Sequence, residues 1–138
     1  MNREEFIATL NRWYDETGVD FNDCHVSHGG SMIMLGLRES TDDIDLTVTR
    51  DVWDQFVADG FKITHLPANG KCAAVDLISV TDKIDIHLEN EWVTHDLYCL
   101  RGIWYRSAIE TLADKLLLGR EKDLKDIPVL QEYINNDY

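Results

Sequence analysis

The sequence contains few of the residues that would place it in several large protein classes. Its 138 residues include three cysteines and two prolines, and no two cysteines have the Cys-x-x-Cys spacing. Thiols this few and scattered exclude a disulfide framework and a cysteine-ligated zinc site. No apolar run approaches the ~18 residues that a membrane span needs. The polar start Met1–Glu5 does not resemble a signal peptide, so we expect a cytoplasmic protein with no membrane association and reduced cysteines.

Basic residues are scarce as well. The chain has 13 Lys and Arg against 26 Asp and Glu, which gives a formal net charge of −13. An extended grip on nucleic acid needs cations against the phosphates, so we expect no binding of extended duplexes. The charge is uneven, because residues 101–125 hold six of the basic residues and four of the acidic ones. This segment favours a small polyphosphate ligand, although scattered lysines on a solvated helix give the same composition.

The hydrophobic pattern predicts one domain over residues 1–138, since 44% of the residues are apolar and a chain of this length can form one core. Apolar spacings of three and four predict helices, and alternation predicts strands. We predict an α/β (α+β) fold, with a mixed β-sheet and helices packed mainly on one side. The predicted helices cover 3–16, 30–36, 51–59, 107–119 and 121–135, the last interrupted at Pro128. The predicted strands cover 21–26, 44–49, 61–66, 72–80, 83–88 and 103–105.

The segment from His28 to Asp45 carries the strongest chemical signal. Gly29-Gly30-Ser31 can form a turn whose backbone N–H groups point outward, and a helix that starts there aims its positive end at a phosphate. Asp43 and Asp45 lie one residue apart on a predicted strand, so both side chains share one face. Like charges held this close favour a bound cation. A phosphate turn beside a cation site predicts metal-assisted phosphoryl or nucleotidyl chemistry.

A third carboxylate fits the same pattern. Alternation along 83–88 puts Asp85 and His87 on one face, and a strand beside that of Asp45 would bring three carboxylates together. Mg²⁺ is held by a few carboxylates together with substrate phosphates. Asp85 would also be placed to take a proton from an acceptor hydroxyl. We interpret His87 as a surface residue, with support of the metal ligands as the alternative.

Other families with a similar aspartate run fit less well. Haloacid dehalogenase-like phosphatases need a buried apolar strand directly before the first Asp, where this chain has Arg38–Asp42, and no later Gly-Asp-x-x-x-Asp run occurs. This family stays as the weaker alternative. A calcium loop needs glycine at its sixth position, which is Val48 here. The five histidines show no His-x-x-x-His spacing, so we do not expect zinc.

The run from His28 to Leu46, with its Gly-Gly-Ser turn and its Asp-Asp-Ile-Asp, resembles the nucleotidyltransferase superfamily of polymerase β-like enzymes. In that family a Gly-Ser turn precedes a short helix and a strand with Asp-x-Asp, and a third Asp lies on a later strand. The similarity is closest to small single-domain members of poorly defined function, some of them in toxin–antitoxin pairs. It continues into Leu112–Lys115 and Gly119–Asp126, and it covers roughly residues 25 to 127. The added domains with which larger relatives grip RNA or DNA have no counterpart in this chain.

The resemblance implies a minimal nucleotidyltransferase fold and a metal-dependent transfer of a nucleoside monophosphate from a nucleoside triphosphate, such as ATP, to a hydroxyl acceptor. The acceptor would be a small molecule, a protein or a tRNA end. The alternative is an antitoxin-like or regulatory protein on the same fold, which binds a partner protein with little or no catalysis.

The resemblance also implies roles for particular residues. Asp123 and Asp126 are expected to form structural ion pairs with nearby basic residues. Phosphate binding is expected of Gly29, Gly30 and Ser31. Binding of Mg²⁺ or Mn²⁺ is expected of Asp43, Asp45 and Asp85, and Asp85 would also act as the base. Lys115 would contact a phosphate or the nucleobase, and Arg120 and Lys122 are weaker candidates for the same contact.

Overall fold

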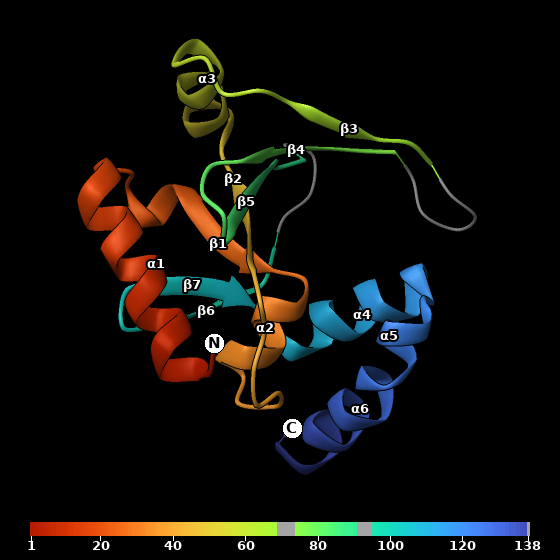
Figure 1. Ribbon diagram of the computed structural model, residues 1–138. Coiled ribbons are helices and arrows are strands. Elements are labelled where there is room, and N and C mark those ends of the chain that lie inside the picture. Colours follow the sequence, from red (N-terminus) through yellow and green to blue (C-terminus); the bar gives the residue numbers. More distant parts are fainter. Residues whose placement is uncertain (69–73, 91–94, 138) are drawn as a thin grey trace.

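The computed structural model describes residues 1–68, 74–90 and 95–137, which form an α+β fold (Figure 1). Its strands make one mixed sheet in the order β3-β4-β5-β2-β1-β7-β6. The strands are β1 (Cys24–Ser27), β2 (Ile44–Val48), β3 (Thr64–Leu66), β4 (Val75–Ser79), β5 (Ile84–Leu88), β6 (Leu97–Leu100) and β7 (Ile103–Arg106). The helices are α1 (Arg3–Thr17), α2 (Gly29–Met34), α3 (Arg50–Ala58), α4 (Ala108–Leu118), α5 (Glu121–Leu124) and α6 (Asp126–Asp137), with a 3-10 turn at Phe21–Asp23.

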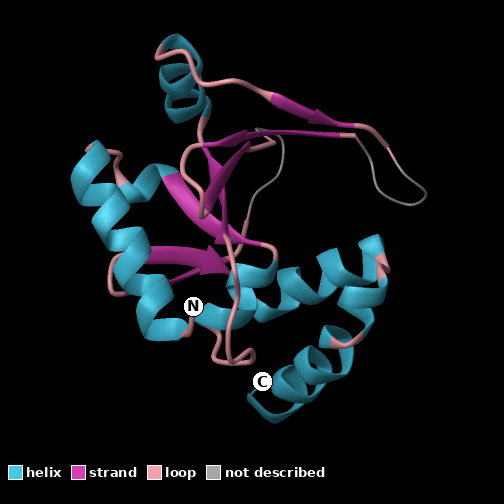
Figure 2. Ribbon diagram, viewed as in Figure 1, coloured by secondary structure: helices cyan, strands magenta, loops and turns pink. Residues whose placement is uncertain are grey.

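One face of the sheet is apolar and packs against α1 and α3 (Figures 1 and 2). Side chains of β2 alternate along the strand, with Ile44 and Leu46 fully buried and Asp45 between them partly exposed. On the helix side, Trp13 of α1 stacks on Phe56 of α3 with ring centroids 5.9 Å apart. Because neighbouring side chains on a strand point to opposite faces, this core turns Asp45 toward the other, polar face.

Helix α2 connects the sheet to the C-terminal helices. Its Ile33 and Met34 belong to the main core, whereas Met32 packs with Ala108 of α4 and Leu130 of α6 in a second, smaller cluster. Figure 1 shows α4, α5 and α6 together on one side of the molecule, next to α2. The turn that precedes α2 is therefore fixed between the sheet and these helices.

The mixed sheet and its helices confirm the predicted fold class, and most predicted elements form with shifted ends. The expected strand 21–26 starts at Cys24, because the Asp20 side chain accepts a hydrogen bond from Asn22 N and holds a 3-10 turn first. The expected strand 61–66 is reduced to β3. Strand β4 starts at Val75, and residues 72–73 of its predicted range lie outside the described residues.

The C-terminal half contains one strand that was not predicted and one predicted interruption that was wrong. Strand β6 was not expected, and it pairs with β7 in an antiparallel hairpin. Pro128 does not interrupt the last segment, because it lies in the first turn of α6, where a helix leaves its N–H groups unpaired in any case. The break falls instead at Lys125, between α5 and α6.

No helix in the described part of the chain combines the length and the apolar character needed to cross a bilayer. Cys24 and Cys99 are free thiols, as predicted, and Cys72 lies outside the described residues.

Candidate active site

The pairing of β2 with β5 places two of the candidate carboxylates side by side. These strands are parallel, and Asp45 is in register with Asp85. Residues in register on neighbouring strands have side chains on the same face of the sheet. Asp43 lies two residues before Asp45, at the entrance to β2. The three candidate carboxylates therefore come from one end of two adjacent strands.

The charges of these carboxylates are close enough to affect one another. Partial burial raises the pKa of the Asp43 carboxyl above its ordinary value, and the negative charges of Asp45 and Asp85 raise it further. Ser79 of β4 donates a hydrogen bond of 2.6 Å to Oδ1 of Asp85. A cation bound beside Asp43 would offset the negative charges that oppose its ionisation.

Asp45 has a close partner in His87, which the sequence analysis had interpreted as a surface residue. The side chain of His87 is only 15% exposed, and its Nε2 lies 3.1 Å from Oδ1 of Asp45. Burial alone would raise the pKa of Asp45, but the hydrogen bond from His87 and nearby positive charges outweigh burial and lower it. The interpretation of His87 was wrong because alternation gives a residue's face and does not give its distance to the next strand.

The glycine turn is shaped by packing. A Cβ on Gly30 would lie 2.6 Å from Cγ1 of Val26 and 2.9 Å from Cζ of Phe6, so the core leaves no room for a side chain there. His28 opens the turn with φ 56° and ψ −137°, a backbone conformation that costs a non-glycine residue about 1–3 kcal/mol. The Ser31 hydroxyl is buried and donates to the Val26 carbonyl oxygen at 3.2 Å. Phosphate binding by this turn stays a prediction, and the Ser31 side chain is engaged within the fold.

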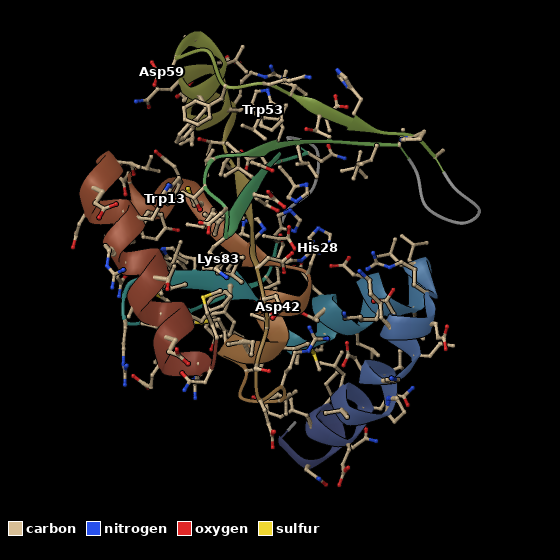
Figure 3. All side chains as sticks on the ribbon, in the orientation of Figure 1. Trp13, His28, Asp42, Trp53, Asp59 and Lys83 are labelled. Carbon is tan, nitrogen blue, oxygen red and sulfur yellow. The ribbon has the colours of Figure 1, made fainter. Side chains whose placement is uncertain are left out.

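A cavity of about 280 Å³ lies on the polar face, bordered by β2 and β5, by the β3–β4 hairpin and by α4 with the segment that follows it. Figure 3 shows His28 in this region, between the strands and the C-terminal helices. Several predicted site residues meet here, whereas Gly30, Ser31 and Asp85 are not in the lining. The lining includes the carboxylates Asp43 and Asp45, the cations Arg38, Lys115, Arg120 and Lys122, the apolar side chains Leu66, Val75 and Leu77, and also His28, Gly29, Thr41 and His87.

The basic side of the cavity is held by a buried ion-pair network. Lys115 is 6% exposed, and its Nζ lies 3.2 Å from Asp123 Oδ1 and 3.1 Å from Asp126 Oδ2. Arg120 Nε lies 2.7 Å from Asp123 Oδ2. These contacts confirm the predicted structural roles of Asp123 and Asp126. Because Lys115 is committed to two carboxylates, it positions the helices as well as lining the cavity.

Lys122 differs from its basic neighbours. It forms no ion pair with any residue that the structure describes, and its charge lowers the pKa of both Asp43 and Asp45. A flexible ammonium group beside the carboxylates can meet an anionic ligand without first leaving a partner. Lys122, which sequence analysis ranked below Lys115, is thus the more available cation.

The apolar side of the cavity was not anticipated as part of the site. Val75 and Leu77 alternate along β4, and Leu66 pairs with Val75 across the hairpin. The alternation Val75-x-Leu77-x-Ser79 was a usable signal, since it puts these residues on one face with Ser79, the partner of Asp85. The sequence could not show that this face is open.

The donor set fits a magnesium ion that arrives with its substrate. No three His, Cys, Asp or Glu side chains among the described residues come close enough together to hold a metal by themselves. Mg²⁺ does not require such a cage, because it keeps several waters and is bound by one or two carboxylates plus substrate phosphates. Asp43 and Asp45, both in the cavity lining, provide this number of oxygen ligands, and Asp85 is adjacent.

Comparison with known proteins adds no family to this picture. No family model matches the chain, and no curated protein matches its sequence at a significant level.

Proposed function

We propose that the protein is a Mg²⁺-dependent nucleotidyltransferase that transfers a nucleoside monophosphate from a nucleoside triphosphate to a hydroxyl acceptor. The observation that carries the proposal is the register of β2 and β5, which sets Asp45 beside Asp85, with Asp43 two residues away. Cationic side chains line the same cavity as Asp43 and Asp45, so carboxylates for a metal and charges for a polyphosphate share one site.

Each of the three carboxylates has a defined task in this reaction, Asp43 and Asp45 from the cavity lining and Asp85 from the strand position beside Asp45. The acceptor oxygen attacks the α-phosphorus, a new P–O bond forms, the bond from the α-phosphorus to the bridging oxygen breaks, and pyrophosphate leaves. Asp85 accepts the hydroxyl proton, with Oδ1 held by Ser79 so that Oδ2 is available. Asp43 and Asp45 would hold the metal, which supplies neutralisation of the phosphate charge when bound.

The side chains around the carboxylates orient the reactants. Lys122 attracts the phosphates, and His87 fixes one oxygen of Asp45 so that the other can face the metal. His28 and Gly29 border the cavity where the phosphates would approach the backbone of the turn. Holding donor and acceptor in this way lowers the entropic part of the barrier.

The proposal is tested by following label from the α-phosphate. The native protein is incubated with Mg²⁺, α-labelled triphosphates and a small-molecule cell extract that supplies acceptors. We expect a labelled adduct and pyrophosphate, and a rate about 10²–10³-fold lower for the Asp43→Asn, Asp45→Asn double variant. Asp59→Asn is the matched control, because Asp59 is an exposed residue at the end of α3 (Figure 3). Undiminished transfer by the double variant would remove the proposal.

A second candidate function is binding of a partner protein with little or no catalysis. It is favoured by exposed apolar residues on α4, where Leu116 is 56% and Leu117 is 75% exposed. Large apolar side chains that neighbour one another on a surface mark many protein interfaces. Co-purification of a stoichiometric partner, together with an absence of metal-dependent triphosphate turnover, would favour this candidate over the enzyme.

A further inference from the structure

We propose that the acceptor is a small hydroxyl-bearing molecule with an apolar face, and that it binds against Leu66, Val75 and Leu77, here called the apolar wall. The proposal rests on the nucleotidyl transfer proposed above and narrows its acceptor, for which the sequence also allows a protein or a tRNA end. It follows from three features of the cavity: the exposure of these side chains, their side of the site and the charge around them.

The apolar wall is formed by large aliphatic side chains that the fold leaves open to solvent. Leu66 is 46% and Val75 is 41% exposed, although they pair across the β3–β4 hairpin and line the cavity with Leu77. Single exposed apolar residues are common on proteins, but several neighbours inside a concave site are typical of a ligand surface. The wall has no hydrogen-bonding side chain, so it selects a ligand by apolar contact.

The order of the strands places the apolar wall on the side of the site from which the acceptor would approach. The sheet runs β3-β4-β5-β2-β1, so the wall and Asp85 lie on one side of Asp45 and the glycine turn after β1 lies on the other. Ser79 lies on the same strand as Val75 and Leu77, and its hydroxyl donates a hydrogen bond to Asp85. A hydroxyl that gives its proton to Asp85 must approach from this side, whereas the triphosphate faces the turn and Lys122.

The charge on this side argues against a nucleic acid. Strands β3, β4 and β5 contain no Lys or Arg, and their polar residues beside the wall include the carboxylate of Asp85. An RNA end would bring phosphates that need cationic or amide partners close to its terminal hydroxyl. The apolar wall offers neither, and the formal net charge of the chain is −13. An uncharged or cationic small molecule has no such conflict.

The test measures binding of 2-phenylethanol, a small alcohol with an apolar ring, by ligand-observed NMR. The protein is first saturated with Mg²⁺ and an α,β-methylene triphosphate analogue that cannot be cleaved at the α-phosphate. We expect saturable binding to the native protein and an affinity about tenfold lower for the Leu66→Ser, Leu77→Ser double variant. Leu117→Ser on α4 is the matched control, with binding unchanged.

Affinity for the triphosphate analogue is measured in the same samples. It distinguishes a failure of the acceptor proposal from a failure of the proposed nucleotidyl transfer, and it reports whether each variant is folded. Equal binding of the alcohol by the native protein and the wall variant, with Mg²⁺-dependent analogue binding intact, overturns the acceptor proposal alone. So does tighter binding of an RNA oligonucleotide that displaces the alcohol. Failure of the native protein to bind the analogue with Mg²⁺ overturns the proposed function and the acceptor proposal with it.

Discussion

Asp45 is held by a residue from the neighbouring strand. Nε2 of His87 donates to Oδ1 of Asp45 at 3.1 Å, and the ring of His28 lies against His87 with centroids 5.4 Å apart. Such contacts fix the rotamer of a carboxylate and reserve its second oxygen for a cation. In the proposed reaction His87 therefore positions Asp45 and takes no direct part in the chemistry.

This role predicts a change in metal affinity. We expect His87→Ala to raise the Mn²⁺ concentration needed for half-maximal analogue binding by about 10–100-fold, because Asp45 loses the group that orients it. His87→Gln should recover part of this loss, since its amide nitrogen can also donate to Asp45. The measurement is a calorimetric Mn²⁺ titration with the analogue present.

His65→Ala provides the control for this prediction, because His65 pairs with Asp76 on the exposed hairpin. Its thermal unfolding and its Mn²⁺ titration should both match those of the native protein. Native metal affinity in His87→Ala would show that the contact with Asp45 has no effect on metal binding.

The C-terminal helices depend on buried charges for their arrangement. Asp123 of α5 is fully buried between Lys115 of α4 and Arg120, and Asp126 of α6 joins Lys115 to Arg38 in the loop that leads to β2. The network connects the three helices to the segment that carries Asp43. At the scale of elements, it therefore positions one side of the cavity relative to the other.

We expect Asp123→Ala to lower the free energy of unfolding by about 3–5 kcal/mol, because it leaves Lys115 buried with one partner fewer. The Lys115→Met, Asp123→Leu double variant should lose less, since it leaves no unpaired charge at this pair. Urea unfolding of the native protein and both variants measures the difference. A double variant less stable than Asp123→Ala would contradict this account of the network.

The pH dependence of stability follows from the same group. Burial would raise the pKa of Asp123, but hydrogen bonds and charges from Arg120 and Lys115 outweigh burial and lower it. The pKa of Asp123 is lower in the folded protein than in the unfolded chain, where an Asp has a pKa of about 3.9. The ionised carboxylate therefore contributes fully to stability above pH about 3.9, and this contribution is lost as the pH falls through the pKa of the folded state. The free energy of unfolding of the Asp123→Asn variant should therefore change less with pH below about 4 than the free energy of unfolding of the native protein.

Local patterns were sufficient for much of this structure. The alternation along 44–48 and 84–88 predicted β2 and β5 and the faces of their aspartates. Helix α4 begins beside its predicted start at residue 107, where the Ser107 side chain accepts a hydrogen bond from Glu110 N. The Glu110 side chain does not return a hydrogen bond to Ser107. It accepts from Asp96 N, a contact that depends on β6, which the local pattern did not reveal.

What the sequence could not supply was the distance between elements. The contact of His87 with Asp45 depends on the register of β2 with β5. The place of the apolar wall in the cavity depends on the β3–β4 hairpin and α4 bordering the same space. Both features depend on tertiary contacts between segments that are distant in the sequence, so no local pattern of residues predicts them. The sequence predicted ion pairs of Asp123 and Asp126 with nearby basic residues, but it could not show that a single buried side chain, Lys115, meets both carboxylates.

At the scale of the whole molecule, the cavity concentrates opposite charges within an acidic protein. The chain carries a formal net charge of −13, yet four cationic side chains border the cavity that holds Asp43 and Asp45. Under the proposed function, a triphosphate that arrived alone would meet both attraction from Lys122 and repulsion from the carboxylates. A divalent cation bound between them would remove the repulsion, so the proposed reaction requires metal and nucleotide to bind together.

Calorimetric titration of the native protein with each of the four nucleoside triphosphates, with and without Mg²⁺, tests this requirement most directly. We predict binding of at least one triphosphate that needs Mg²⁺ and disappears in the Asp43→Asn, Asp45→Asn variant while Asp59→Asn retains it. No triphosphate binding by the native protein, or binding indifferent to both Mg²⁺ and the two aspartates, would contradict the account.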